Sequence, residues 1–128
     1  MKHILFVALV SVASLTSLTA CDDNATCEGD RCVCAGGGAC TVDCTPGASE
    51  CHVQASPGEA VDVTCNNNAE CHVECSQASS CNVDCGGSAD CDVTCPPTGC
   101  TVTSCVDCDV TCGLTGIATH AGTNATCP

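Results

Sequence analysis

Cysteine is the residue type with the most chemical potential in this sequence, because 19 of the 128 residues are cysteines. Cysteines bind metal ions as thiolates, act as redox pairs or cross-link a chain as disulfides. Thiolate clusters favour Cys-x-Cys spacing, which occurs only at Cys32-Val33-Cys34. Most other cysteines recur as Cys-x-Val-x-Cys, as in CNVDCGGSADCDVTC at 81–95, and a valine between two cysteines indicates packing. We therefore interpret the cysteines as structural disulfides.

Histidine is the second candidate for chemistry. His52 and His72 occupy the same position in two similar segments of the chain. If these segments stacked as adjacent coils of a solenoid, the two histidines would lie about 4.8 Å apart. Together with Glu74 they could then bind Zn²⁺ or Cu²⁺. The alternative interpretation is two exposed histidines on a polar face, with no cofactor.

The elements that would position these residues are eight short repeats. Each contains a five-residue unit in which the first, third and fifth positions are typically Cys, Val and Cys, and the second and fourth are polar. The units begin at Cys40, Cys51, Val61, Cys71, Cys81, Cys91, Cys100 and Cys108. Alternation with a period of two is typical of a β-strand with one apolar face, and the linkers are rich in turn-forming residues. The sequence therefore predicts eight short strands with valine at the centre of each dry face.

Strand geometry determines how the cysteines can pair. Two cysteines four residues apart on one strand are separated by about 13 Å, whereas a disulfide requires Cα atoms within about 7 Å. The fifth position of one unit can instead reach across the turn to the first position of the next. Ala55 and Val61 support this pairing, because these two expected partners have both lost their cysteine. Neighbour pairing along the chain predicts nine disulfides: Cys27–Cys32, Cys34–Cys40, Cys44–Cys51, Cys65–Cys71, Cys75–Cys81, Cys85–Cys91, Cys95–Cys100, Cys105–Cys108 and Cys112–Cys127.

Two all-β architectures suit this pattern. In a small, disulfide-rich β-solenoid, alternate strands form two thin parallel sheets with valine facing valine across the core. In an antiparallel β-meander stapled by cross-turn disulfides, the strands would form a single sheet whose apolar face is exposed to water. This exposure is unfavourable and favours the solenoid. We expect a signal peptide over residues 1–20, a tether and cysteine cap over 21–39, the repeats over 40–112 and a C-terminal cap over 113–128.

Composition and charge exclude several classes of protein. From Cys21 onward there is no Phe, Tyr, Trp, Met or Lys, so large side chains cannot form an ordinary core. The formal net charge is −13, and a surface this acidic repels phosphate backbones, which excludes nucleic acid as a partner. No catalytic set of side chains stands out, and we expect no enzyme activity.

The N-terminal 21 residues have the pattern of an export signal. Lys2 precedes an apolar stretch from Ile4 to Ala13, and small residues follow it. Leu18-Thr19-Ala20-Cys21 resembles the lipobox of bacterial lipoproteins. The resemblance implies that Cys21 becomes the mature N-terminus, carries acyl chains and anchors the chain in membrane lipid. Neighbour pairing also leaves Cys21 as the one unpaired cysteine, which agrees with this interpretation.

These expectations together describe a lipid-anchored protein of the bacterial cell envelope, on its periplasmic or cell-surface side. The expected function is that of a structural or interaction module, such as a spacer or adhesion module, with an envelope or surface partner. The alternative function is metal binding at the surface through His52, His72 and Glu74.

Overall fold

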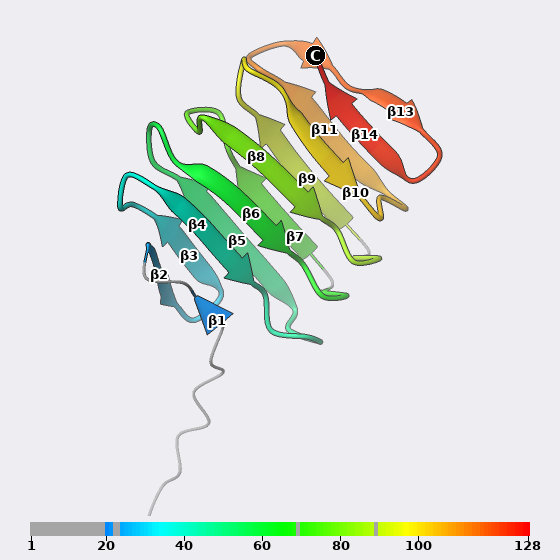
Figure 1. Cartoon of the computed structure of the whole chain (residues 1–128). Helices are drawn as coiled ribbons and strands as arrows, with labels where there is room; N and C mark the ends of the chain where they lie inside the picture. Colours follow the sequence, from blue (N-terminus) through cyan, green and yellow to red (C-terminus); the bar gives the residue numbers. More distant parts are fainter. Residues whose placement is uncertain (1–19, 22–23, 69, 89) are drawn as a thin grey trace, which may run out of the picture.

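The repeats form strands that coil into a two-sheet solenoid (Figure 1). The computed structural model describes residues 20–21, 24–68, 70–88 and 90–128, which contain strands and turns but no helix. None of these residues belongs to a helix long and apolar enough to cross a membrane. The predicted signal peptide lies outside the described residues, apart from Ala20, and so does the side chain of Cys21.

Fourteen strands are formed by the described residues. They are β1 (Ala20–Cys21), β2 (Ala25–Glu28), β3 (Arg31–Cys34), β4 (Ala39–Asp43), β5 (Glu50–Ala55), β6 (Ala60–Thr64), β7 (Glu70–Glu74), β8 (Ser80–Asp84), β9 (Asp90–Cys95), β10 (Cys100–Thr103), β11 (Cys108–Cys112), β12 (Gly116–Ile117), β13 (Thr119–Ala121) and β14 (Asn124–Cys127). Each of the eight predicted units is a strand, β4 to β11.

Alternate strands belong to opposite sheets, as the solenoid interpretation predicts. One sheet has the order β1-β4-β6-β8-β10-β14-β13 and the other β12-β11-β9-β7-β5-β3-β2. We call the second one the histidine sheet, because β5 and β7 carry His52 and His72. The repeat strands pair in parallel with the strand two positions along the chain, and Cys51, Cys71 and Cys91 are in register, so one coil is 20 residues long. This parallel pairing confirms the solenoid and excludes the meander.

Two columns of valine fill the thin core between the sheets. Val53, Val73 and Val93 stack in register in the histidine sheet, and a matching column faces them from the other sheet. These three side chains are almost completely buried. Alternation therefore places the predicted dry face inside, with short side chains that suit a narrow space between sheets.

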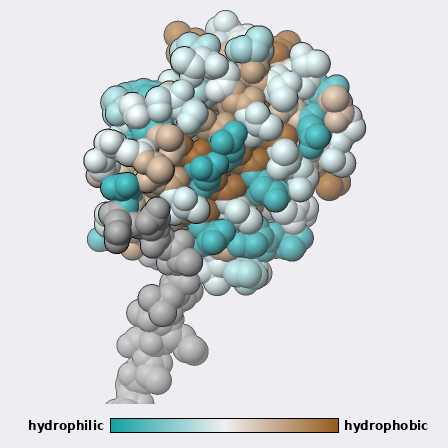
Figure 2. All heavy atoms as spheres, in the orientation of Figure 1, coloured by the Kyte–Doolittle hydropathy of each residue, from teal (hydrophilic) through white to brown (hydrophobic). Residues whose placement is uncertain are grey.

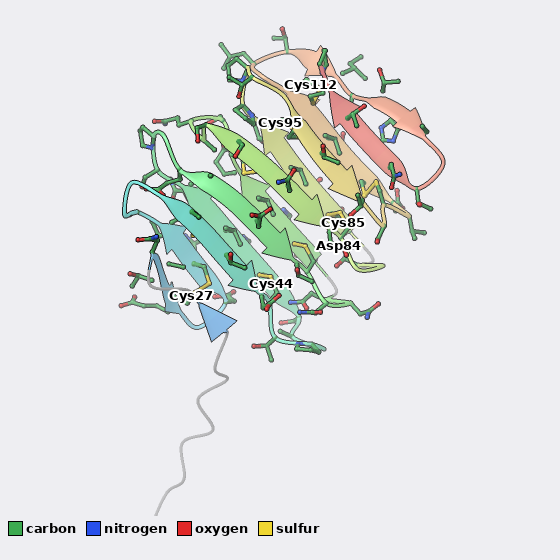
Figure 3. All side chains as sticks on the ribbon, in the orientation of Figure 1. Cys27, Cys44, Asp84, Cys85, Cys95 and Cys112 are labelled. Carbon is green, nitrogen blue, oxygen red and sulfur yellow. A yellow bond between two sulfur atoms is a disulfide. The ribbon has the colours of Figure 1, made fainter. Side chains whose placement is uncertain are left out.

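Nine disulfides join described cysteines, and all except Cys27–Cys32, which links the paired strands β2 and β3, close corners of the solenoid. They join Cys27–Cys32, Cys34–Cys40, Cys44–Cys51, Cys65–Cys71, Cys75–Cys81, Cys85–Cys91, Cys95–Cys100, Cys105–Cys108 and Cys112–Cys127, which are the nine pairs that neighbour pairing predicts. Apart from Cys27–Cys32, they form two columns, one on each side of the solenoid. Figure 3 shows Cys44 and Cys85 on one side and Cys95 and Cys112 on the other.

One corner has no disulfide. Ala55 and Val61 are both buried there, and their strands stack on those of Cys34 and Cys40 in the preceding coil. The side chain of Glu59 is 1% exposed at this corner and points toward the preceding coil.

The ends of the solenoid differ from the interior of the coil stack. At the N-terminal end, β2 pairs antiparallel with β3, while β3 pairs parallel with β5. The coils thus begin at β3, within the range 21–39 that the sequence suggested as a tether and cap. The repeat pattern concealed this strand, because in β3 the cysteines Cys32 and Cys34 point inward and Val33 points outward. At the C-terminal end, β14 pairs antiparallel with β10 and buries Ala125 against it.

Candidate functional site

The outer face of the histidine sheet carries ladders of polar side chains. Because neighbouring strands are parallel and in register, side chains at the same repeat position form a column. Arg31, His52, His72 and Asp92 are successive members of one such column. A parallel column nearer the start of each strand contains the acids that precede each first cysteine, Glu50, Glu70 and Asp90.

The two histidines lie side by side on adjacent coils. Their ring centroids are 4.9 Å apart and the ring planes are inclined by 14°, so the imidazoles are stacked. This arrangement confirms the predicted adjacency of His52 and His72. Both side chains are about one-third exposed and accessible from solvent.

Each histidine has carboxylates as neighbours. The Nε2 atom of His52 is 3.1 Å from Oε2 of Glu50. In His72 the two ring nitrogens face different acids: Nδ1 is 3.1 Å from Oδ2 of Asp92, and Nε2 is 3.6 Å from Oε2 of Glu70. Each imidazole nitrogen donor therefore has carboxylate oxygen donors beside it, and first-row transition metals bind both kinds of donor.

Glu74 does not complete the predicted metal-ligand set. Its Oε1 accepts a hydrogen bond of 3.0 Å from the backbone N–H of Ser76. Within the described part of the chain, the ligand atoms of His52, His72 and Glu74 do not all lie within 4.8 Å of one another, whereas those of Asp30, Glu50 and His52 do. The structure thus brings the two histidines together but replaces Glu74 with acids that sequence reasoning missed.

His52, His72 and Glu74 line an open groove on the sheet with a volume of about 450 Å³. Its polar lining comes from Arg31, His52, Gln54, His72, Glu74, Asp92 and Thr94. The hollow on the outer face of the opposite sheet is smaller, with a volume of about 190 Å³. Figure 2 shows hydrophilic side chains beside hydrophobic residues on that face. The groove of the histidine sheet is therefore the better candidate for a binding site.

Glu59 forms a second polar cluster, inside the fold. Its Oε1 accepts hydrogen bonds from the backbone N–H groups of Gly36, at 2.8 Å, and Gly37, and its Oε2 accepts one of 3.0 Å from Gly38. These three donors, Gly37 foremost, hold the pKa of the Glu59 carboxyl below its ordinary value against the opposing effect of burial. The three glycine amides thus form an anion-binding concavity that the protein's own carboxylate occupies.

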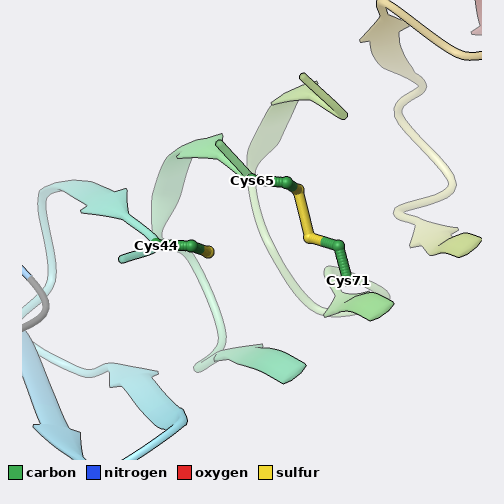
Figure 4. A group of neighbouring side chains, drawn as sticks. All are labelled: Cys44, Cys65 and Cys71. Atoms are coloured by element: carbon green, nitrogen blue, oxygen red, sulfur yellow. A yellow bond between two sulfur atoms is a disulfide. The ribbon is translucent and has the colours of Figure 1, made fainter. Parts of the chain in front are cut away.

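The cysteines offer no thiolate site among the described side chains, because none of those cysteines is free. Sulfur atoms from neighbouring coils do come together, as those of Cys44, Cys65 and Cys71 do within 4.8 Å (Figure 4). Each of these three cysteines is already in a disulfide. Their proximity reflects the stacking of cross-links along one corner of the solenoid.

Some of the residues that the sequence interpretation missed can be recognised in the sequence. Glu50 precedes its repeat in the same way as Glu70 and Asp90 precede theirs, so an acid two residues before each histidine belonged to the repeat. Asp30 lies in the turn before β3, a strand that the repeat pattern did not include. The triple glycine that holds Glu59 is the only Gly-Gly-Gly in the chain, at 36–38.

The fold and its cross-links define a class: a two-sheet β-solenoid with short apolar side chains inside, disulfide columns at its corners and an acidic surface. Comparisons with protein-family models, with curated proteins and with solved structures found no match.

Proposed function

We propose that the chain is an exported lipoprotein that acts as a structural or interaction module at the bacterial cell envelope. The observation that carries this proposal is the set of nine disulfides between neighbouring strands. Such cross-links form and persist in oxidising compartments such as the periplasm or the cell surface. Short loops closed in this way stabilise a domain that lacks large core side chains.

Anchoring by lipid at Cys21 is the second part of the proposal. Support comes from Leu18-Thr19-Ala20-Cys21 and from the odd number of cysteines, since the nine disulfides among the described side chains pair 18 of the 19. A lipoprotein-type anchor with more than one acyl chain would hold the protein stably at a membrane.

The proposed role as a spacer or adhesion module is supported by the way each repeat unit divides its residues between the core and the surface of the solenoid. The first, third and fifth positions of each unit build the core, so the second and fourth positions are free to meet a partner. Because the net charge is −13, that partner is a surface with neutral or positive groups rather than nucleic acid. We propose no catalytic activity.

Fractionation of cells that produce the full chain tests this proposal. Wild-type protein is expected in the membrane fraction, with an intact mass that includes acyl chains on Cys21, and Cys21→Ser is expected to lose both. Globomycin, which blocks lipoprotein signal peptidase, should cause the precursor to accumulate. A mature protein with an unmodified Cys21, or a folded protein with many free thiols, would contradict the proposal.

The second candidate function is binding of Zn²⁺ or Cu²⁺ at the cell surface. The stacking of His52 and His72, with carboxylates 3.1 Å from a ring nitrogen of each, favours it. Equilibrium dialysis against Zn²⁺ and Cu²⁺ tests this function. Retention of metal by the wild type and its loss on replacing both histidines with alanine would support it, and no retention would exclude it.

A further inference from the structure

We propose that Asp30, Glu50 and His52 form a binding site for one divalent transition-metal ion of the Zn²⁺ or Cu²⁺ class. The site lies on the outer face of the histidine sheet, where β5 begins beside the turn between β2 and β3. This inference rests on the second candidate function and replaces its ligand set, since it excludes Glu74 and assigns two acids in its place.

The ligand atoms are close to the spacing that a metal ion requires. One atom from each of the three side chains lies within 4.8 Å of the other two. In a tetrahedral zinc site with metal–ligand distances near 2.1 Å, neighbouring ligand atoms are about 3.4 Å apart. The 3.1 Å between Nε2 of His52 and Oε2 of Glu50 is within a few tenths of an ångström of that value. An ion can replace the shared hydrogen bond with little movement of either side chain.

The backbone fixes the positions from which these side chains project. Glu50 and His52 are two residues apart on β5, so alternation places both on the outer face. The backbone N–H of His52 donates a hydrogen bond of 2.8 Å to the carbonyl oxygen of Asp30, which ties the turn to the strand. Only side-chain torsions remain to be ordered when an ion binds.

The neighbouring histidine is less suited to bind an ion in this way. The acids around His72 face opposite nitrogens, with Asp92 at Nδ1 and Glu70 at Nε2. One ion bonds to one ring nitrogen, so these two carboxylates cannot both join it at His72. Around His52, by contrast, one atom of the histidine lies within 4.8 Å of an oxygen from each acid.

The charges around the site favour binding of a cation, except for that of Arg31. The site contains two carboxylates, and the chain as a whole is strongly acidic. Arg31 is in register with His52 on β3 and opposes a cation there. A substitution that removes this positive charge should therefore strengthen metal binding.

Titration calorimetry of the oxidised full chain in detergent, with ZnCl₂ as the probe and CuCl₂ in a parallel series, tests the site. The wild type is expected to bind one ion, Asp30→Asn and Glu50→Gln to weaken binding at least about tenfold each, and His52→Ala to lower it further. Arg31→Ala should tighten binding. All four side chains are at the surface, and circular dichroism of each variant checks that the fold is kept.

Two control variants separate this inference from the function on which it rests. Glu74→Gln and His120→Ala, on β13, should leave the zinc affinity unchanged within twofold. If zinc binds but its affinity is unchanged in Asp30→Asn and Glu50→Gln, or falls as much in Glu74→Gln, the second candidate function stands and this site is refuted. If no zinc binds at millimolar concentration, both are refuted.

Discussion

Restoring the missing cross-link at the one corner without a disulfide should stabilise the protein. Ala55 and Val61 occupy the positions that cysteines occupy at the neighbouring corners, and they are in register with Cys34 and Cys40 of the preceding coil. At the flanking corners the bonded Cα atoms are 5.8 Å and 6.2 Å apart, between Cys34 and Cys40 and between Cys75 and Cys81. The double variant Ala55→Cys/Val61→Cys is therefore expected to form a tenth disulfide.

The size of the effect follows from the loop that would be closed. A loop of seven residues loses about 8 cal/mol/K of chain entropy on cross-linking, which is about 2.4 kcal/mol at 25 °C. Replacing the buried Val61 with the smaller cysteine opposes this by about 0.8 kcal/mol, the value of one methyl group. The net increase in the free energy of unfolding is thus about 1.5 kcal/mol.

Intact mass and guanidinium unfolding measure the two parts of this prediction. The new disulfide lowers the mass by two hydrogens relative to the dithiol form, and a peptide map should contain the linked 55–61 pair. The unfolding midpoint should rise above that of the wild type. Ala55→Ser/Val61→Ser is the matched control, because serine is close in size to cysteine but cannot cross-link. Two persistent free thiols at 55 and 61, or a midpoint no higher than that of the wild type, would refute the reasoning about the corner.

Three further predictions test the valine core, the buried Glu59 carboxylate and the disulfides. Val73→Ala should lower the free energy of unfolding by about 2 kcal/mol in a guanidinium titration, because it removes two buried methyl groups and leaves a cavity. Val106→Ala is the control, because Val106 is 78% exposed and its replacement should change the free energy of unfolding little. Because the folded-state pKa of Glu59 is lowered, its stabilising contribution is fully present above the ordinary value of 4.5 and is lost as the pH falls through the folded-state pKa. Glu59→Gln should therefore lower the unfolding midpoint at neutral pH and make the midpoint depend less on pH below 4.5. A variant whose midpoint falls with acid as steeply as that of the wild type would contradict this prediction. Full reduction under native conditions should abolish the strand signal in far-ultraviolet circular dichroism, and a reduced chain that kept this signal would show that sulfur is dispensable.

The fold could be predicted from the sequence because one physical constraint acts at every repeat. A strict period of two assigns each residue of a unit to the inside or the outside, and the paired loss of cysteine at Ala55 and Val61 determines which cysteines join. Parallel stacking then follows, because only a second sheet can cover the apolar face. The strands β4 to β11 agree with this prediction in position, and the nine disulfides agree with it in pairing.

The candidate site was harder to predict, since it depends on residues that the repeat does not specify. The adjacency of His52 and His72 follows from the coil length alone. Asp30, however, reaches His52 only because β3 adds a strand with its cysteines in the inward positions, and that strand lacks the central inward valine of the repeats. Glu74 is at the right distance in sequence, but its carboxylate bonds to the turn at Ser76. The direction of a side chain at a strand end depends on local hydrogen bonds, which the repeat period does not determine.

Glu59 shows that a solenoid corner can be closed by two different kinds of chemistry. At most other corners a disulfide joins the two sides of one turn within a single coil, whereas Cys112–Cys127 joins β11 to β14. At the corner without one, the Glu59 carboxylate bonds to the preceding coil through Gly36, Gly37 and Gly38, while its backbone carbonyl accepts a hydrogen bond of 2.7 Å from Ser79 of the following coil. The disulfide restrains the unfolded chain as well as the folded one, whereas the hydrogen bonds of Glu59 to both neighbouring coils form only when three coils are already stacked. The corner at 55–61 should therefore depend on its neighbours more than the others do, and it is where hydrogen exchange should first detect separation of the N-terminal coils from the rest of the stack.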